Sequence, residues 1–107
     1  MDSNFIAGLT EEEKKAYRDF VSILTSIDSE EETEALLDDL LTDKEVLDII
    51  DRLLVLDDLY RGKSQREIAS NRSMSLCKIT RGSKMLKKKD GFMRRLLSAR
   101  YDDHVHI

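Results

Sequence analysis

The stretch RGKSQREIASNRSMSLCKITRGSKMLKKK, residues 61–89, decides the fold. Gly62 is placed to end one helix, and Ser64 is placed to cap the start of the next. A polar break at residues 71–73 separates that helix from a further helical pattern over residues 75–86. Two short helices joined by a tight turn, with basic side chains on the second, are typical of a helix-turn-helix that binds DNA.

Charge is divided unevenly along the chain. Residues 1–60 contain 5 Lys and Arg against 18 Asp and Glu, whereas residues 61–100 contain 13 basic residues against 2 acidic ones. A basic segment that coincides with a helix-turn-helix pattern predicts binding to a polyanion, with double-stranded DNA as the expected partner. The alternative is that the two halves of the chain neutralise each other.

Composition limits the class of protein. The 107 residues fit one domain, with 40% hydrophobic residues, 37% charged residues and no proline, which favours helix over sheet. No apolar run approaches the roughly 20 residues that cross a bilayer, and no secretion signal is visible. The single cysteine, Cys77, has no partner for an intrachain disulfide. These features predict a cytoplasmic protein without a membrane contact.

Four capping patterns mark helix starts upstream of the break and within the helix-turn-helix. Each has Ser or Thr followed three residues later by Glu, ahead of apolar residues at helical spacing: Thr10/Glu13, Ser29/Glu32, Thr42/Glu45 and Ser64/Glu67. We therefore expect a flexible arm over 1–9, a helical dimerisation core over 10–60 and the helix-turn-helix over 61–89. Together with a last helix, this predicts an all-α fold of six helices.

The predicted helix over residues 43–61 carries apolar residues on more than one face, Leu53 and Leu54 among them. Such a helix must be covered on most sides, and a chain this short offers little to cover it. The pattern predicts a homodimer with this helix near the two-fold axis, while a compact monomer is the alternative.

The end of the chain carries less information. Asp90 is placed to cap a last helix over 90–100, and residues 101–107 are expected to form a frayed tail. His104 and His106 alternate with acidic neighbours in a way that could hold a metal, but a solvated tail is the preferred interpretation and no metal site is predicted. No nucleophile elbow, phosphate loop or dinucleotide fingerprint is present, so the sequence does not indicate an enzyme.

The motifs ITRGSKMLK (79–87) and RGKSQREI (61–68) keep a nearly ungapped spacing, and LT followed by acidic residues lies upstream at 41–42. With these motifs, residues 41–89 resemble the core of the Trp repressor family. The resemblance implies an intertwined, all-helical homodimer that presents two recognition helices to successive major grooves, roughly 34 Å apart. It also implies a transcriptional regulator, with repressor as the expected role.

The resemblance assigns DNA-facing positions along both helices of the motif. They are Arg66, Ala69, Leu76, Cys77, Lys78, Thr80 and Lys87. Arg66 has the fork for guanine or phosphate, Lys78 and Lys87 supply charge, and Leu76 suits a thymine methyl. Ala69 stands where the family carries a lysine, so one phosphate contact is expected to be missing.

The resemblance also points to a ligand site for L-tryptophan. Arg52 and Arg81 match the two arginines that enclose the indole, with Thr42 near the polar end of the amino acid and Gly82 leaving room for the ring. The position that carries a serine in tryptophan-binding members is Met85, which offers no donor. The sequence predicts no cofactor. L-Tryptophan is one candidate for a co-repressor, and Met85 argues against it.

Two further departures lie in the turn of the motif. Ser73 stands where glycine is usual, at a position expected to have positive φ, and Arg72 stands where an apolar residue is common. They favour a turn that is looser, or one that orders when DNA binds. The whole sequence thus predicts a homodimeric helix-turn-helix regulator; the alternative is a helical interaction module whose basic patch binds an acidic protein.

Overall fold

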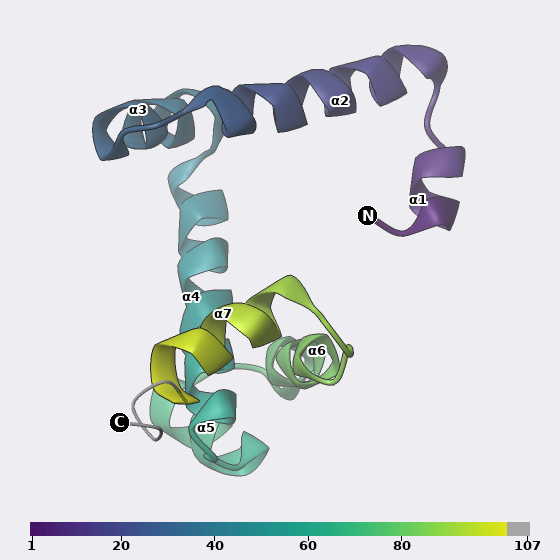
Figure 1. The fold of residues 1–107 in the computed structure, drawn as a ribbon. Coiled ribbons are helices and arrows are strands. Elements are labelled where there is room, and N and C mark those ends of the chain that lie inside the picture. Colours follow the sequence, from purple (N-terminus) through teal and green to yellow (C-terminus); the bar gives the residue numbers. More distant parts are fainter. Residues whose placement is uncertain (103–107) are drawn as a thin grey trace. The chain divides into compact units, whose positions relative to one another are not determined.

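A computed structural model describes residues 1–102, and every regular element in them is a helix, which confirms the all-α prediction (Figure 1). The helices are α1 (Ser3–Ala7), α2 (Glu11–Ser26), α3 (Glu30–Leu40), α4 (Asp43–Tyr60), α5 (Gln65–Arg72), α6 (Leu76–Leu86) and α7 (Phe92–Tyr101). The described residues thus hold seven helices where six were expected. The additional helix is α1, in the expected loose arm, where the Asp2 carboxylate accepts a hydrogen bond from the Asn4 N–H at 2.7 Å.

Helices begin where the capping patterns predict. Thr10 and Glu13 form a complete capping box at the start of α2. The Ser29 hydroxyl accepts from the Glu32 N–H at the start of α3, and Ser64 caps α5 in the same way. Helix α4 begins directly after Thr42. None of the helices in the described residues is long and apolar enough to cross a membrane.

The chain divides into two compact units, Met1–Thr42 and Asp43–Ile107. In the first unit no side chain is buried, although α2 and α3 are amphipathic. Its large exposed apolar residues include Phe20, Val21, Ile23, Leu24, Leu37 and Leu40. A unit of this kind lacks an apolar core of its own, so its apolar faces remain available for a partner surface.

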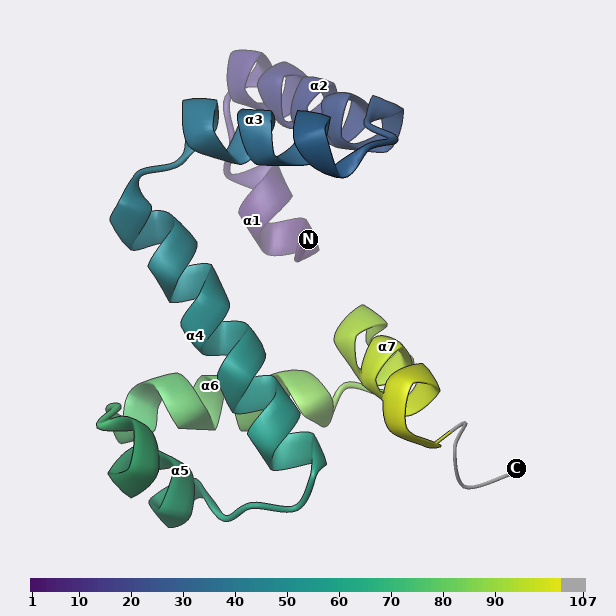
Figure 2. The same ribbon diagram turned by 90° about the vertical axis from the view of Figure 1, so that its left-hand side faces the viewer.

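The second unit contains the hydrophobic core, formed by side chains from α4, α5 and α6; Figure 2 shows the ribbons of these three helices. Val55 from α4, Ile68 from α5 and Ile79 from α6 are buried against one another, with Leu59, Ala69 and Met74 packed around them. Each of the three helices contributes one central residue, so this small cluster fixes α5 and α6 on the C-terminal half of α4. Ile68 and Ile79 are fully buried, and Ala69 is half-buried against them.

Gly82 allows α6 to approach α4 closely. Its backbone is buried, and a Cβ at this position would lie 3.1 Å from Val55 Cγ1 and 3.4 Å from Leu59 Cδ1. The distance to Val55 is tighter than ordinary van der Waals contact, and the distance to Leu59 is at its lower limit. The absent side chain therefore serves helix packing, in addition to the role that the family resemblance implied for it.

The start of α7 differs from the prediction. Asp90 does not cap the helix: the N-cap is Gly91, without a side-chain hydrogen bond, and Asp90 has a φ of 58°. A left-handed residue at this point turns the chain between α6 and α7, so its side chain is not in the capping position. Arg94 on α7 donates instead to the Leu86 carbonyl at 3.0 Å, at the C-terminal end of α6.

The helix α7 extends to Tyr101, into the segment expected as a tail, and its end is tied to α4. The Tyr101 hydroxyl donates to Asp57, and the Tyr60 hydroxyl donates to Asp102 at 2.5 Å. Each hydrogen bond to a carboxylate raises the pKa of the tyrosine that donates it. The two rings stack with centroids 6.0 Å apart. His104 and His106 lie outside the described residues.

We predict that Gly82→Ala lowers the free energy of unfolding by about 1 kcal/mol, because overpacking against Val55 outweighs the better helix propensity of alanine. Urea denaturation measures this change. Val55→Ala is the matched background, since it removes the Cγ1 atom that the new Cβ would meet. In that background Gly82→Ala should stabilise the protein, and an equal penalty in both backgrounds would contradict the proposed clash.

Candidate nucleic-acid interface

A short turn joins α5 to α6. Ser73 has φ 53° and ψ 44°, in the left-handed region, which confirms the positive φ expected at this position. The N–H groups of Ser73 and Met74 both donate to the Ala69 carbonyl, and the Ser75 hydroxyl then caps α6 through the Lys78 N–H. The chain therefore reverses within three residues, and α6 starts at a defined point on the surface.

The helix α6 presents an exposed, shallow hollow on its outer side. Leu76, Cys77, Thr80, Arg81 and Lys84 line it, and Leu76 is 56% exposed. Three of the predicted DNA-facing residues, Leu76, Cys77 and Thr80, thus share one accessible face. Such a mixture of apolar and hydrogen-bonding groups, flanked by cations, suits base edges and phosphates in a major groove.

The other predicted DNA-facing residues have different surroundings. Arg66 is exposed in the first turn of α5, and Lys87 is exposed at the C-cap of α6. Ala69 is half-buried against the apolar core. The Thr80 hydroxyl lies 3.4 Å from Gln65 Oε1, a contact that links the outer surfaces of α6 and α5.

Lys78 faces the acidic side of α4. Its ammonium lies 3.8 Å from Asp51 and 4.0 Å from Asp48, at the edge of a cavity of about 320 Å³. The cavity is lined by Asp48, Asp51, Arg52, Val55, Met74, Cys77, Lys78 and Arg81. Asp48 and Asp51, which lie on the same helix as Arg52, are thus engaged by Lys78.

The cavity brings together two of the predicted ligand-site residues, Arg52 and Arg81. Met85 is half-buried further along α6 and is not among the residues that line the cavity in the described chain. Gly82 faces α4, and Thr42 belongs to the first unit.

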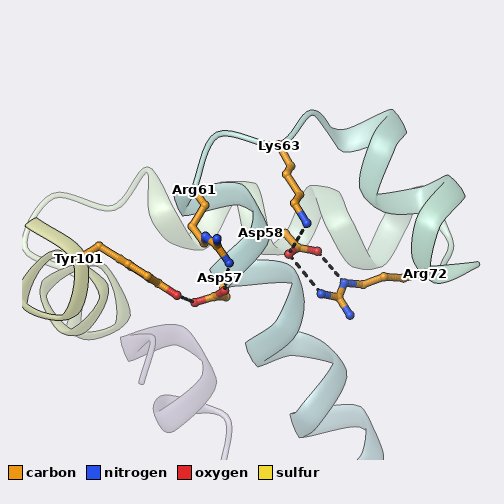
Figure 3. A network of polar contacts seen from close by, with 6 residues as sticks. All are labelled: Asp57, Asp58, Arg61, Lys63, Arg72 and Tyr101. Atoms are coloured by element: carbon orange, nitrogen blue, oxygen red, sulfur yellow. Dashed lines mark hydrogen bonds and ion pairs between the residues drawn. The ribbon is translucent and has the colours of Figure 1, made fainter.

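A buried carboxylate joins the turn to α4 (Figure 3). Asp58 is 3% exposed and accepts hydrogen bonds from Arg72 Nε at 2.6 Å and Arg72 Nη2 at 3.2 Å. Lys63 Nζ lies 3.4 Å from the same carboxylate. We call these three residues, Asp58, Lys63 and Arg72, the Asp58 clamp. Both cations come from outside α4, one from the loop before α5 and one from the last turn of α5.

The charges in the clamp stabilise one another. The hydrogen bond from Arg72 lowers the pKa of the Asp58 carboxyl below its ordinary value of 3.8, against the opposing effect of burial, and Lys63 lowers it further. The same hydrogen bond raises the pKa of Arg72. Asp58 therefore stays ionised at neutral pH, and its contribution to stability is lost only as the pH falls through its lowered pKa.

Sequence reasoning did not find the clamp. Arg72 was recognised as unusual at a position where an apolar residue is common, but no partner was assigned to it. The available signal was a second anomaly, an acidic pair at residues 57–58 inside an otherwise apolar helix end. A charge at an inward position on each of two neighbouring helices predicts an ion pair between them.

Two helices joined by a left-handed turn, with the second exposing a cation-flanked face, define the class of helix-turn-helix DNA-binding proteins. Sequence comparison gives the family: the family described as Trp repressor protein matches residues 15–100, and the chain belongs to the Trp repressor family. Proteins described as Trp operon repressor homologs from Xylella fastidiosa strains M23, Temecula1 and 9a5c are each 34% identical over 88 residues. The match covers 79% of this chain and 96% of the relative. No solved structure matches the chain significantly.

Family membership makes the chain a DNA-binding regulator. Members of the family are regulators rather than enzymes. The resemblance inferred from residues 41–89 is thereby confirmed, and the match also covers α3 and most of α2 and α7.

We predict that Ser73→Gly raises the free energy of unfolding by about 1 kcal/mol, because glycine adopts left-handed φ without the steric conflict of a Cβ. Thermal or urea denaturation measures the gain. Ser70→Gly is the matched control within α5, where the same substitution should destabilise the protein through lost helix propensity. A loss of stability in Ser73→Gly would contradict the assigned strain.

Proposed function

We propose that the chain is a transcriptional repressor that binds a near-palindromic DNA site as a homodimer, with α6 in the major groove. The observation that carries the proposal is the exposed face of α6, on which Leu76, Cys77 and Thr80 lie together after a tight turn. Residues 61–100 supply the positive charge that draws this face to DNA. Side chains at the start of α6 contact base edges and determine which DNA sequence is bound, and the surrounding cations bind the phosphates of the DNA backbone.

Individual side chains have separate tasks in this proposal. Arg66 and Lys87 contact phosphate from the two ends of the motif, and Thr80 adds a hydroxyl. Lys78 leaves its carboxylate partners for phosphate, which costs little because those ion pairs are long and half-exposed. Ala69 contributes packing against the core and no phosphate contact.

The homodimer follows from apolar surface that neither unit covers internally. The first two thirds of α4 expose Leu47, Ile49, Ile50, Leu53 and Leu54, and the first unit exposes the apolar faces of α2 and α3. Contiguous apolar faces of this kind mark an interface. A second copy of the chain provides matching faces through two-fold symmetry, so each copy covers the other.

DNA binding without tryptophan is part of the proposal. Arg52 and Arg81 remain beside the cavity, but the Lys78 side chain stands at its edge and Met85 offers no donor to an amino acid. We therefore infer that the protein recognises its DNA site in the absence of L-tryptophan.

The deciding experiment is selection from a random-sequence duplex library, followed by affinity measurement at several salt concentrations. We expect enrichment of a two-fold-related sequence, with affinity falling by about 10³–10⁵ between 50 and 200 mM salt if 6–10 phosphates are contacted. Added L-tryptophan should leave this affinity unchanged. Salt-sensitive binding to acidic proteins without enrichment of any DNA sequence would favour the interaction-module alternative.

Lys78→Ala should weaken binding to the enriched duplex by about tenfold and reduce the salt slope by about one phosphate contact. Its circular dichroism and urea midpoint should remain those of the wild-type protein, since the Lys78 ion pairs are partly exposed. Lys15→Ala removes the same charge from α2 and is the control for general electrostatics. Equal affinities for wild-type and Lys78→Ala would remove Lys78 from the interface.

Leu53→Asp tests the homodimer. Leu53 is 48% exposed in a single chain, so the substitution should leave the fold of one chain intact while placing a charge in the dimer interface. Sedimentation or light scattering should show a monomer, and Lys44→Asp on the same helix should remain dimeric. A stable Leu53→Asp dimer would show that the interface lies elsewhere.

A further inference from the structure

Asp58 is unusual because its side chain is both charged and buried, and no other charged side chain within residues 1–102 is buried. A buried ion pair is weak evidence for stability, since desolvation offsets most of the attraction. The clamp nevertheless has short, well-directed contacts, with Arg72 using two nitrogens of its fork on the two carboxylate oxygens. Such a fork restricts orientation more strongly than apolar contact does.

The position of the clamp is adjacent to the DNA-binding face. Arg72 is the last residue of α5, Ser73 forms the turn, and α6 begins at Leu76. Apart from the clamp, the helix-turn-helix is held to α4 mainly by the small apolar cluster around Val55, Ile68 and Ile79. Apolar contacts are non-directional and tolerate small rotations of one helix on another.

We propose that the Asp58 clamp is a positioning device, which fixes the pose of α6 on α4 and thereby sharpens DNA sequence selection, while adding no more stability than a pair of apolar residues would. The proposal rests on the DNA-reading role of α6 described above. A rotation of α6 would move Leu76 and Cys77 relative to base edges, where contacts depend on geometry. Phosphate contacts made by flexible lysines would survive it, so affinity for unrelated DNA would change little.

The central experiment uses the double variant Asp58→Leu/Arg72→Leu. It removes one acid and one base, so the net charge of the protein is unchanged. Replacing a buried ion pair by apolar residues is often neutral for stability, so the urea midpoint should stay close to that of the wild type. The affinity ratio between the enriched duplex and a scrambled duplex should fall by about tenfold, comparable to the loss of one good base contact.

Arg72→Lys provides a second, conservative test. It keeps the positive charge beside Asp58 but lacks the fork, so the protein should fold while losing selectivity. Glu11→Gln/Lys14→Gln is the control, because it neutralises an exposed ion pair of α2 that lies outside the helix-turn-helix. That control should retain both stability and selectivity.

Arg72→Leu alone separates positioning from simple loss of stability. At pH 7 it removes both hydrogen bonds from Arg72 and leaves the buried carboxylate with Lys63 alone from the clamp, so the urea midpoint should drop. In the wild type the pKa of Asp58 is lowered from 3.8. The free energy of unfolding that its ion pair contributes is therefore fully present above pH 3.8, and it shrinks as the pH falls through the lowered pKa. The double variant should not show this pH dependence, since it has no carboxylate at position 58.

The outcomes are distinct. A selectivity ratio within twofold of the wild type in both Asp58→Leu/Arg72→Leu and Arg72→Lys overturns the positioning role. If the double variant does not fold, Arg72→Lys decides: a folded, unselective protein supports the proposal, and a folded, selective one overturns it. If the wild-type protein enriches no DNA sequence from the duplex library, the proposed function itself is contradicted, and this result is known before any variant is compared.

Discussion

The buried carboxylate of Asp58 is the constraint around which the second unit is arranged. An ionised group that is 3% exposed needs donors from the protein, and α4 itself does not supply them. Lys63 and Arg72 reach it from the two ends of α5, so the loop after α4 and the turn before α6 are held to the same carboxylate. The hydrogen bonds that this carboxylate needs therefore fix the position at which α6 starts.

The helix α4 divides its residues between two tasks. Its C-terminal half buries Val55 and Leu56 and accepts α6 at the close distance that Gly82 permits. Its N-terminal half leaves apolar residues exposed, and we assign these to a second copy of the chain. A single helix therefore connects the proposed dimer interface with the DNA-binding face. A structural change at the interface end of α4 can thus alter the pose of α6.

Much of the candidate site could be predicted from local sequence. Ser64 and Ser75 mark the starts of α5 and α6, and the spacing of the motif predicts the left-handed residue at position 73. Both features depend on short-range hydrogen bonds, which form between residues close in sequence. Side-chain partners across helices could not be predicted in this way. The sequence does not indicate, for example, that Lys78 lies beside Asp48 and Asp51, because only the crossing of α6 over α4 brings those groups together.

The sequence by itself determined helices α2 to α6 and where they start, the placement of positive charge and the membership of a DNA-binding family. These depend on neighbours within a few residues or on motifs at fixed spacing. Only the tertiary structure decided that Arg72 bonds to Asp58, that Gly82 makes room for Val55, and that Asp90 turns the chain instead of capping α7. Each of these depends on where separate helices meet, and distances across helices are set by packing, which a linear pattern does not encode.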